Sequence, residues 1–263
     1  REELQYLSLS HRERLTQSGI EAALSASRSR AAPQLAGTAS LLNIETHTDQ
    51  VRLDFSYPMH RSRSLDATIR LGVSRHDGRT ETLGAAQLHD RISALRLGFS
   101  FDGVDRWRGV NRLDLELSEG LTAFGASRFN DPQASRPGGR PSFTKLTLYL
   151  ARLQSLGNRF SLLGALSAQQ AQTNLLAPEE FAYGGEYFGR GYDASEIAGD
   201  SGAAAKLELR YTLESRRRNG LTLYVFGDHG RIWRRLGAGE IAAPTEHASS
   251  AGLGARVTVG SWL

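Results

Sequence analysis

The stretch "VRLDFSYPMHRSRSLDATIRLGVSR", residues 51–75, decides the fold because apolar residues recur at every second position. Its first half places on one face Val51, Leu53, Phe55 and Tyr57, with Arg52, Asp54 and Ser56 opposite. Its second half places on one face Leu65, Ala67, Ile69, Leu71 and Val73, with Asp66, Thr68 and Arg70 opposite. A period of two residues is typical of a β-strand, so the stretch predicts two strands joined by a turn, each with an apolar and a charged face.

The same alternation recurs along the whole chain. We count about 12 such segments, near residues 2–10, 19–28, 38–46, 50–57, 64–75, 91–102, 110–118, 143–153, 158–170, 203–213, 220–230 and 250–260. Many are longer than the ~5–6 residues usual for soluble strands and approach the roughly 9–11 residues with which a tilted strand crosses a bilayer. The sequence therefore predicts an all-β fold, a transmembrane antiparallel β-barrel.

The connections between segments support a barrel from residue 58 onward. Short links ("PMHRSR", "GVDRWR", "QSLGN" and "ESRRRN") alternate with long ones at 76–90, 119–142, 171–202 and 231–249. Transmembrane barrels carry short turns at one rim and long loops at the other. A soluble β-sandwich with a solvated charged face remains the alternative from the strand pattern alone.

Charged residues on the non-apolar faces would line the interior once the barrel closes. They are Asp54, Asp66, Arg70, Arg96, Arg112, Asp114, Glu116, Lys206, Glu208, Arg210 and Arg256. Unpaired buried charges are too costly, so we expect this interior to hold water or polar loops.

Composition narrows the function classes. The 263 residues show no linker-like shift in composition, so we expect one domain over residues 1–263. The net charge of +4 is spread along the chain, which does not indicate nucleic-acid binding. The sequence contains no cysteine, which excludes disulfides and thiolate sites. The first residues, "REELQYLSLS", lack an apolar signal core, and we expect a fragment, incomplete at both ends, whose targeting segment lies upstream.

Three ordered motifs carry a family resemblance. "FAYGGEYFGRGYD", residues 181–193, resembles the conserved Arg-Gly-Tyr/Phe loop of the outer-membrane superfamily of two-partner secretion transporters (TpsB, the hemolysin secretion/activation proteins) and barrel-assembly insertases. "LDFSYPMHRSRSL" looks like that family's strand, turn and strand, and "LYVFGDHGRIW" is similar to its Phe-x-Asp-x-Gly strand. These details favour the secretion transporter over the insertase.

The resemblance implies a barrel of 16 strands in a Gram-negative outer membrane, preceded by two periplasmic POTRA domains. Our 12 segments would then be strands 3 to 14, with loop 171–202 folded into the lumen. The implied partners are a secreted exoprotein, outer-membrane lipids and lipopolysaccharide. We expect a monomer that binds no nucleic acid and needs no cofactor or metal.

The resemblance also implies the functional residues, which we expect to be the lumen-loop motif Phe188, Gly189, Arg190, Gly191, Tyr192 and Asp193. In the family the loop arginine pairs with the aspartate of the Phe-x-Asp-x-Gly strand, here Phe226, Asp228 and Gly230. Strand parity agrees, because Asp228 lies on the face opposite Leu221, Leu223 and Val225. Glycines without a Cβ let the backbone approach closely, so we expect that role or an ordinary turn at Gly184, Gly185 and Gly230.

Enzyme and metal hypotheses are weaker. Asp228 and His229 resemble a catalytic dyad, but neighbours on one strand point to opposite faces. We find no Gly-x-Ser-x-Gly elbow, Walker loop or His-Glu-x-x-His motif, so we expect no catalytic residues. The pairs His76-Asp77 and His89-Asp90 flank the predicted loop 76–90, where solvated polar residues are a simpler interpretation than a divalent-ion site.

Overall fold

The computed structural model describes residues 4–32, 43–214, 220–236 and 244–258, which form one antiparallel sheet of 11 strands. Chain neighbours are sheet neighbours throughout, and the short β9 (Phe181–Tyr183) and β10 (Ile197–Gly199) form a separate pair. The sheet strands are β1 (Leu4–Arg14), β2 (Glu21–Ala31), β3 (Glu45–Arg61), β4 (Leu65–Thr82), β5 (Ala85–Val104), β6 (Gly109–Leu121), β7 (Thr144–Ser155), β8 (Phe160–Ala171), β11 (Ser201–Glu214), β12 (Gly220–Trp233) and β13 (Thr245–Thr258).

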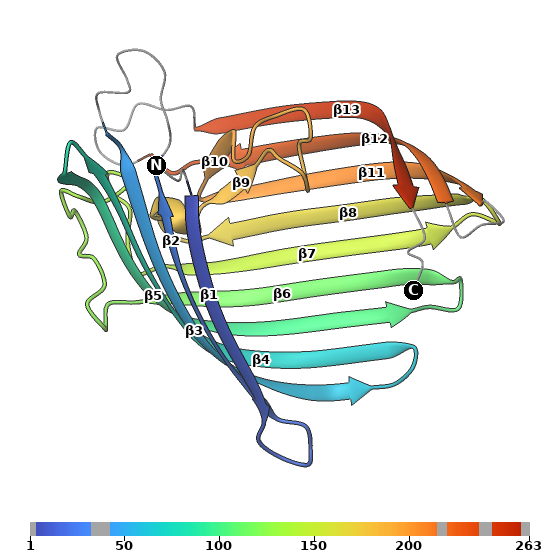
Figure 1. Cartoon of the computed structure of the whole chain (residues 1–263), viewed down its shortest axis with the longest axis horizontal. Helices are drawn as coiled ribbons and strands as arrows, with labels where there is room; N and C mark the ends of the chain where they lie inside the picture. Colours follow the sequence, from blue (N-terminus) through green and yellow to red (C-terminus); the bar gives the residue numbers. More distant parts are fainter. Residues whose placement is uncertain (1–3, 33–42, 215–219, 237–243, 259–263) are drawn as a thin grey trace.

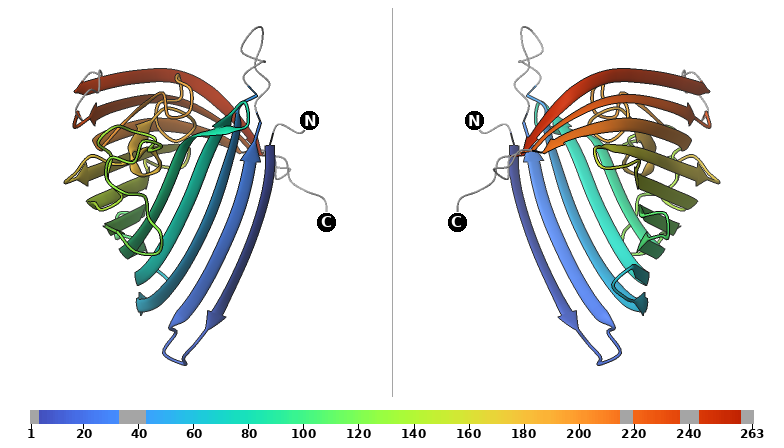
Figure 2. Two further views of the ribbon diagram at one scale, coloured as in Figure 1. Left: turned by 90° about the vertical axis from the view of Figure 1, so that its left-hand side faces the viewer. Right: turned by 90° about the vertical axis from the view of Figure 1, so that its right-hand side faces the viewer.

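The sheet curves into an open half-barrel with β1 and β13 at its edges (Figures 1 and 2). Its ladders are regular, and β3 and β4 pair from Glu45↔Glu81 to Arg61↔Asp66. Register shifts occur between Pro58 and His60 and between Thr80 and Glu81, and the first has a local cause, because proline has no N–H to donate to a ladder.

Burial is inverted relative to a water-soluble sheet. The apolar face points away from the concave side and is exposed, as at Phe55 (44%), Leu71 (49%) and Val225 (53%). Several charged residues on the concave face are buried, such as Glu208 (1%) and Asp228 (4%). This arrangement suits a sheet with lipid outside and a polar interior, which confirms the predicted membrane-barrel architecture and makes the soluble sandwich wrong. Within the described ranges, no helix is both long and apolar enough to cross a membrane.

Two strand predictions were wrong. Segments 38–46 and 50–57 are not separate strands, because residues 45–61 form the single strand β3, while residues 38–42 lie outside the described residues. The predicted long loop 76–90 is also absent, since β4 and β5 continue to Thr82 and from Ala85 and leave a turn at 83–84. Side chains on both faces of these strand ends are polar, so the alternation that marks a half-buried strand disappears there.

The corrected strands extend the rim asymmetry toward the amino terminus. Short links at 15–20, 62–64, 105–108 and 156–159 lie at one rim. The other rim carries loops 122–143 and 172–200, together with the tight turn at 83–84. We call the latter the loop rim. The link at 215–219 lies outside the described residues.

The outward face of β4 offers a test of its lipid exposure. Ile69 is central in the outward apolar run and lies across from Tyr57 and Phe99. We expect Ile69→Arg to cost about 2–4 kcal/mol of unfolding free energy, because a cation would lie near the bilayer midplane. Urea unfolding of the full-length protein in lipid vesicles measures this cost.

Ser56→Arg is the matched control, since Ser56 faces inward and is paired with Glu21 and Arg70. We expect a change of about 0.5 kcal/mol or less there. Equal costs at both positions would contradict the assignment of the two faces.

Candidate functional site

Loop 172–200 lies on the concave side of the sheet (Figure 2). It begins with a 3-10 turn, Ala177–Glu179, and continues into β9, which pairs with β10 from Phe181↔Gly199 to Tyr183↔Ile197. Residues 184–196 form the tip between β9 and β10. The loop is therefore a small hairpin held against the barrel wall.

Glycines give the tip its tight backbone. Gly184, Gly185 and Gly189 have φ values of 126°, 99° and 79°, which side chains other than glycine rarely tolerate. The turn closes through hydrogen bonds donated by Gly184 N to Phe188 O (3.1 Å) and by Tyr192 N to Gly189 O (2.9 Å). The sequence left open whether Gly184 and Gly185 are ordinary turn glycines, and here both adopt left-handed conformations.

Two aromatic rings of β9 pack against glycines of the barrel wall and hold β9 in place. Tyr183 is fully buried, and its ring lies so close to Gly230 that a Cβ there would overlap it. Phe181 lies against Gly202 in the same way. The cluster comprises Phe181, Tyr183, Ala204, Ile232 and Ala248, with Phe188 and Ile197 packed against it. Glycines on β11 and β12 thus form the recesses into which the hairpin rings fit.

Arg190 contacts two carboxylates on the wall. Its Nη2 lies 2.6 Å from Glu208 Oε2, while its Nε lies 3.8 Å from Asp228 Oδ2. The Arg190 backbone N–H also donates to Asp228 Oδ2 at 3.4 Å, and the guanidinium stacks 3.9 Å from the Phe226 ring centroid. The structure therefore brings Arg190, Phe226 and Asp228 together, but the shortest ion pair is with Glu208.

Glu208 is the residue that sequence reasoning missed as a partner. Its Oε1 also accepts from Arg210 Nε at 2.7 Å and from Arg256 Nη1 at 2.8 Å, so three guanidiniums surround one buried carboxylate. Alternation placed Glu208 on the lumen face, but pairing across strands and loop depends on register, which alternation does not give.

The other predicted loop residues are more peripheral. Tyr192 donates its hydroxyl hydrogen to Ser249 O at 3.0 Å, and its ring centroid lies 6.0 Å from that of Tyr183. A Cβ at Gly191 would lie 3.1 Å from Ser250 Cβ. Asp193 is exposed and has only a backbone role, since Glu196 N donates to its carbonyl at 3.3 Å.

The base of the loop has its own anchors. Asp200 is fully buried and pairs with Arg136 of loop 122–143 at 2.7 Å. Its carboxylate also accepts from the backbone N–H groups of Leu175 and Arg235, each at 2.6 Å. Gln169 Nε2 donates to the carbonyls of both Glu179 and Asp200, each at 3.0 Å. Three loops at this rim are thereby tied to one another.

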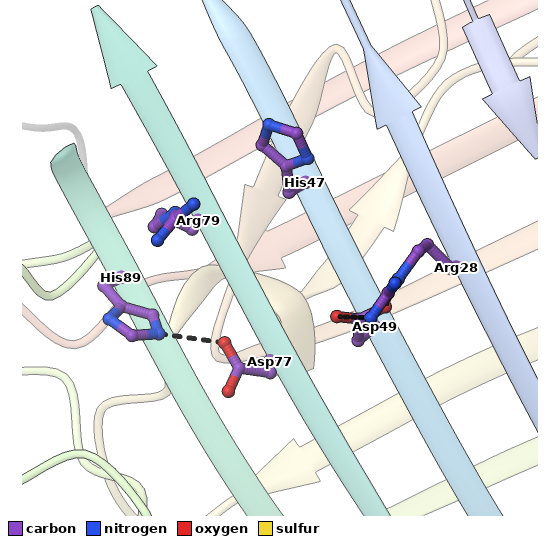
Figure 3. Close-up of a pocket in the computed structure, with 6 residues that line it drawn as sticks. All are labelled: Arg28, His47, Asp49, Asp77, Arg79 and His89. Carbon is purple, nitrogen blue, oxygen red and sulfur yellow. Dashed lines mark hydrogen bonds and ion pairs between the residues drawn. The ribbon is translucent and has the colours of Figure 1, made fainter. Parts of the chain in front are cut away.

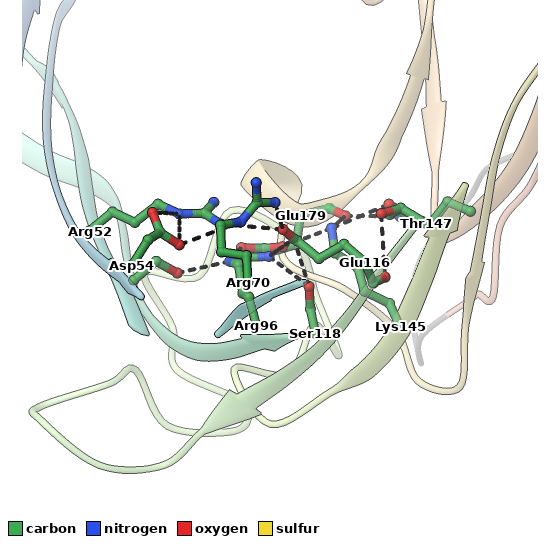
Figure 4. A network of polar contacts seen from close by, with 11 residues as sticks. Arg52, Asp54, Arg70, Arg96, Glu116, Ser118, Lys145, Thr147 and Glu179 are labelled. Atoms are coloured by element: carbon green, nitrogen blue, oxygen red, sulfur yellow. Dashed lines mark hydrogen bonds and ion pairs between the residues drawn. The ribbon is translucent and has the colours of Figure 1, made fainter. Parts of the chain in front are cut away.

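Glu179 joins the loop to a network of charges across the wall (Figure 4). Arg96 Nη2 lies 2.6 Å and Lys145 Nζ 2.7 Å from the two carboxylate oxygens of Glu179. Arg96 also reaches Glu116, which pairs with Arg70 at 3.1 Å. Burial tends to raise the pKa of Glu179, but Lys145 and Arg96 outweigh it and hold this pKa below its usual range.

The dyad and ion-site candidates do not assemble. Asp228 points to the loop, whereas His229 lies on the other face, where its Nδ1 is 2.8 Å from Ser249 Oγ. His89 Nε2 contacts Asp77 Oδ1 at 2.8 Å across β4 and β5, which are strands here and not a loop base. No cluster of three or more metal-ligating side chains occurs among the described residues.

The recess at Gly230 can be tested. We expect Gly230→Ala to destabilise docking of the hairpin by about 1–3 kcal/mol, because the new methyl group would overlap the Tyr183 ring. Limited proteolysis at the tip, residues 184–196, reports the undocked fraction in the full-length protein.

Gly227→Ala is the control on the same strand, since a Cβ there meets nothing within 4 Å. We expect it to leave tip cleavage unchanged. Equal cleavage of the two variants would mean that the hairpin does not depend on this recess.

The buried carboxylate gives a second prediction. Glu208→Ala would leave three guanidiniums without their shared partner, and losing one member of a buried pair costs about 3–5 kcal/mol. We expect lower stability to urea and faster tip proteolysis. Glu186→Ala in the exposed tip is the control, and an equal effect there would contradict a special role for Glu208.

Comparisons with known proteins agree with this geometry. CdiB from Escherichia coli matches with a TM-score of 0.71 at 16% identity, over 97% of this chain and 50% of that one. CdiB from Acinetobacter baumannii matches with a TM-score of 0.67 at 16% identity, over 95% and 44%. BamA from Haemophilus ducreyi lacking POTRA domains 1–3 matches with a TM-score of 0.63 at 12% identity, over 96% and 56%. No curated protein matches the chain.

The chain thus spans about half the length of the solved CdiB structures. At 16% identity, the structural similarity shows that the barrel fold is shared. Residues 19–257 match the model of the family described as haemolysin secretion/activation protein ShlB/FhaC/HecB. That match takes in β2 to β12, the loop hairpin and nearly all of β13. The chain therefore belongs to the haemolysin secretion/activation protein family ShlB/FhaC/HecB, whose members are β-barrel proteins of the Gram-negative outer membrane.

Proposed function

We propose that the full-length protein is an outer-membrane pore that secretes a partner exoprotein, adhesin-like or hemolysin-like, in an unfolded state. The observation that carries this proposal is the docking of loop 172–200 on a charged lumen wall through Arg190, Glu208 and Asp228. A charged, polar wall suits passage of an extended polypeptide, because backbone and side-chain polar groups can stay hydrated along it. A loop held in that lumen controls how much of the path is open.

Loop 172–200 divides into a base with many buried contacts and a tip with fewer contacts to the wall. Glu179 and Asp200 at the base are nearly or fully buried and are held by several cations and backbone donors. Residues 191–196 of the tip are exposed, and the charged ties between the tip and the wall are Arg190 and Lys206, whose Nζ donates to Tyr187 O at 2.8 Å. Passage of an exoprotein would therefore move the tip more readily than the base, since fewer contacts would break.

Arg190 suits this role better than a lysine would. The guanidinium stacks on Phe226 while it pairs with Glu208 and approaches Asp228, so its planar shape and its charge are both used. A lysine ammonium offers a point charge without the planar stacking surface.

The eleven sheet strands change the numbers that these strands would have in the family's 16-stranded barrel. If loop 172–200 is the family's sixth long loop, β8 before it is strand 11, and the sheet strands β1 to β13 correspond to strands 4 to 14. The range of strands 3 to 14 expected from the sequence counted β3 twice.

The POTRA domains expected before the barrel would capture the amino-terminal secretion domain of the exoprotein.

The other proposed properties follow from the same role. The barrel would act as a monomer among outer-membrane lipids and lipopolysaccharide, with folding of the exoprotein outside the cell giving direction to transport. We propose that it performs no catalysis and uses no cofactor, metal or nucleic acid.

The test compares the native host with a deletion of the full-length gene and with Arg190→Ala at matched expression. We expect one large exoprotein to disappear from the medium after deletion, with other barrels unchanged, and Arg190→Ala to lower its secretion at least tenfold because the tip loses its tie. Secretion and envelope proteomics measure both effects. Arg128→Ala in the exposed part of loop 122–143 is the matched control.

A broad fall in outer-membrane barrels after deletion would instead identify an insertase of the same superfamily. Full secretion by both Arg190→Ala and Asp228→Ala would remove this contact from the mechanism.

A further inference from the structure

A row of basic side chains crosses four strands on the outward face near the loop rim. The ladders pair Arg30 with His47, His47 with Arg79, and Arg79 with His89, so the four residues lie side by side on β2, β3, β4 and β5. They share the outward face with Val51 on β3 and Val73 on β4 by strand alternation. We call Arg30, His47, Arg79 and His89 the basic row.

Acids lie on both sides of the basic row and hold its arginines in place. Arg79 Nη2 lies 2.8 Å from Glu81, and Arg30 Nη2 lies 2.7 Å from Glu45. In these pairs the cation is the more exposed partner, at 48% against 23% and 47% against 16% of the side chain. The acids therefore orient the guanidiniums and leave them as the more exposed member of each pair.

The opposite side of the row is hollowed. Asp49 and Asp77 are paired across β3 and β4, and Arg28 binds Asp49 through Nε at 2.6 Å and Nη2 at 3.1 Å. A cavity of about 430 Å³ opens between these acids and the row, with the lining residues shown in Figure 3: Arg28, His47, Asp49, Asp77, Arg79 and His89. The Arg28 side chain is 75% exposed, so its remaining N–H groups point to the surroundings.

The height of the row selects the kind of ligand. On β4 the outward apolar run ends at Val73, and Arg79 follows six residues later, which is about 20 Å along a strand. With a strand tilt of about 40°, Arg79 lies roughly 15 Å beyond the end of this apolar run, and His47, four residues from Val51 on β3, lies roughly 10 Å beyond it. A phospholipid headgroup layer is only about 5–8 Å deep on each side. A ligand that reaches the row from the membrane must therefore carry a larger headgroup.

We propose that the basic row and its cavity bind the phosphorylated saccharide headgroup of an outer-leaflet glycolipid, lipopolysaccharide. Arg28, Arg30 and Arg79 donate hydrogen bonds to its phosphates, which suits planar guanidiniums. His47, His89 and the carboxylates bond its sugar hydroxyls. The inference rests on the outer-membrane location of the barrel and is independent of secretion, because the row faces away from the lumen.

The experiment uses the full-length protein in a phosphate-free detergent. The probes are purified rough lipopolysaccharide and the same material stripped of phosphate with hydrofluoric acid, and thermophoresis gives each Kd. We expect phosphate removal to weaken binding at least tenfold. We expect Arg79→Gln and Arg30→Gln each to weaken binding of the intact glycolipid about fivefold, as one lost cation near an anionic surface implies.

Arg112→Gln is the matched control, because Arg112 is 57% exposed and pairs with Asp114 at 2.7 Å but faces the lumen. It should bind as the parent protein does, and heat-modifiable gel mobility verifies that each variant folds. Equal binding by Arg79→Gln and Arg112→Gln would overturn the proposal.

Two further results would also overturn it. If inorganic phosphate alone binds as tightly as the glycolipid, the row is a simple anion site. If Arg79→Gln keeps glycolipid affinity but loses exoprotein secretion, the row contacts the exoprotein instead. Failure of secretion in Arg190→Ala with normal glycolipid binding leaves this proposal standing, so the two functions are tested separately.

Discussion

The structure depends on the need to neutralise charges on the inward face of a sheet whose other face is apolar. Eleven strands turn their apolar residues outward, which leaves arginines, lysines, aspartates and glutamates in the interior. Such groups are tolerated only when they are hydrated or paired. Loop 172–200 supplies two of the missing partners, because Glu179 meets Arg96 and Lys145, and Arg190 meets Glu208. The loop and the wall therefore stabilise each other.

Shape complements charge at the same interface. The rings of Phe181 and Tyr183 reach the wall only because Gly202 and Gly230 carry no side chain. A ring stacked on a glycine brings the two backbones close, which shortens the reach that Arg190 needs to meet Glu208. The glycines on β11 and β12 are thus conditions for the ion pair, although neither one touches it.

The sequence predicted most of the fold because alternation survives wherever one strand face meets lipid. It failed at 38–57 and 76–90, where β3, β4 and β5 continue past the membrane and both faces carry polar residues such as Thr46, His47 and His76. The site was partly predictable for a similar reason. Parity placed Asp228 and Glu208 on the lumen face, and the motif pointed to Arg190. Which carboxylate lies closest is set by the docked position of the loop, and strand parity carries no information about that position.

The polar strand ends that led to those wrong predictions also explain how the barrel is organised along its axis. Strands β4 and β5 contain 18 and 20 residues, about twice what a tilted strand needs to cross a bilayer. Their inner faces at the loop rim support the packing of loop 122–143, where Ser135 N donates to Asp90 at 3.0 Å. Arg136, the next residue, then reaches Asp200 at the base of the second loop. Loop 122–143 is therefore fixed on the part of β4 and β5 that extends beyond the membrane. Through Arg136, loop 122–143 in turn holds the base of loop 172–200. With the base held by Arg136, Arg96 and Lys145, the tip with Arg190 is the part of the loop that can move within the lumen.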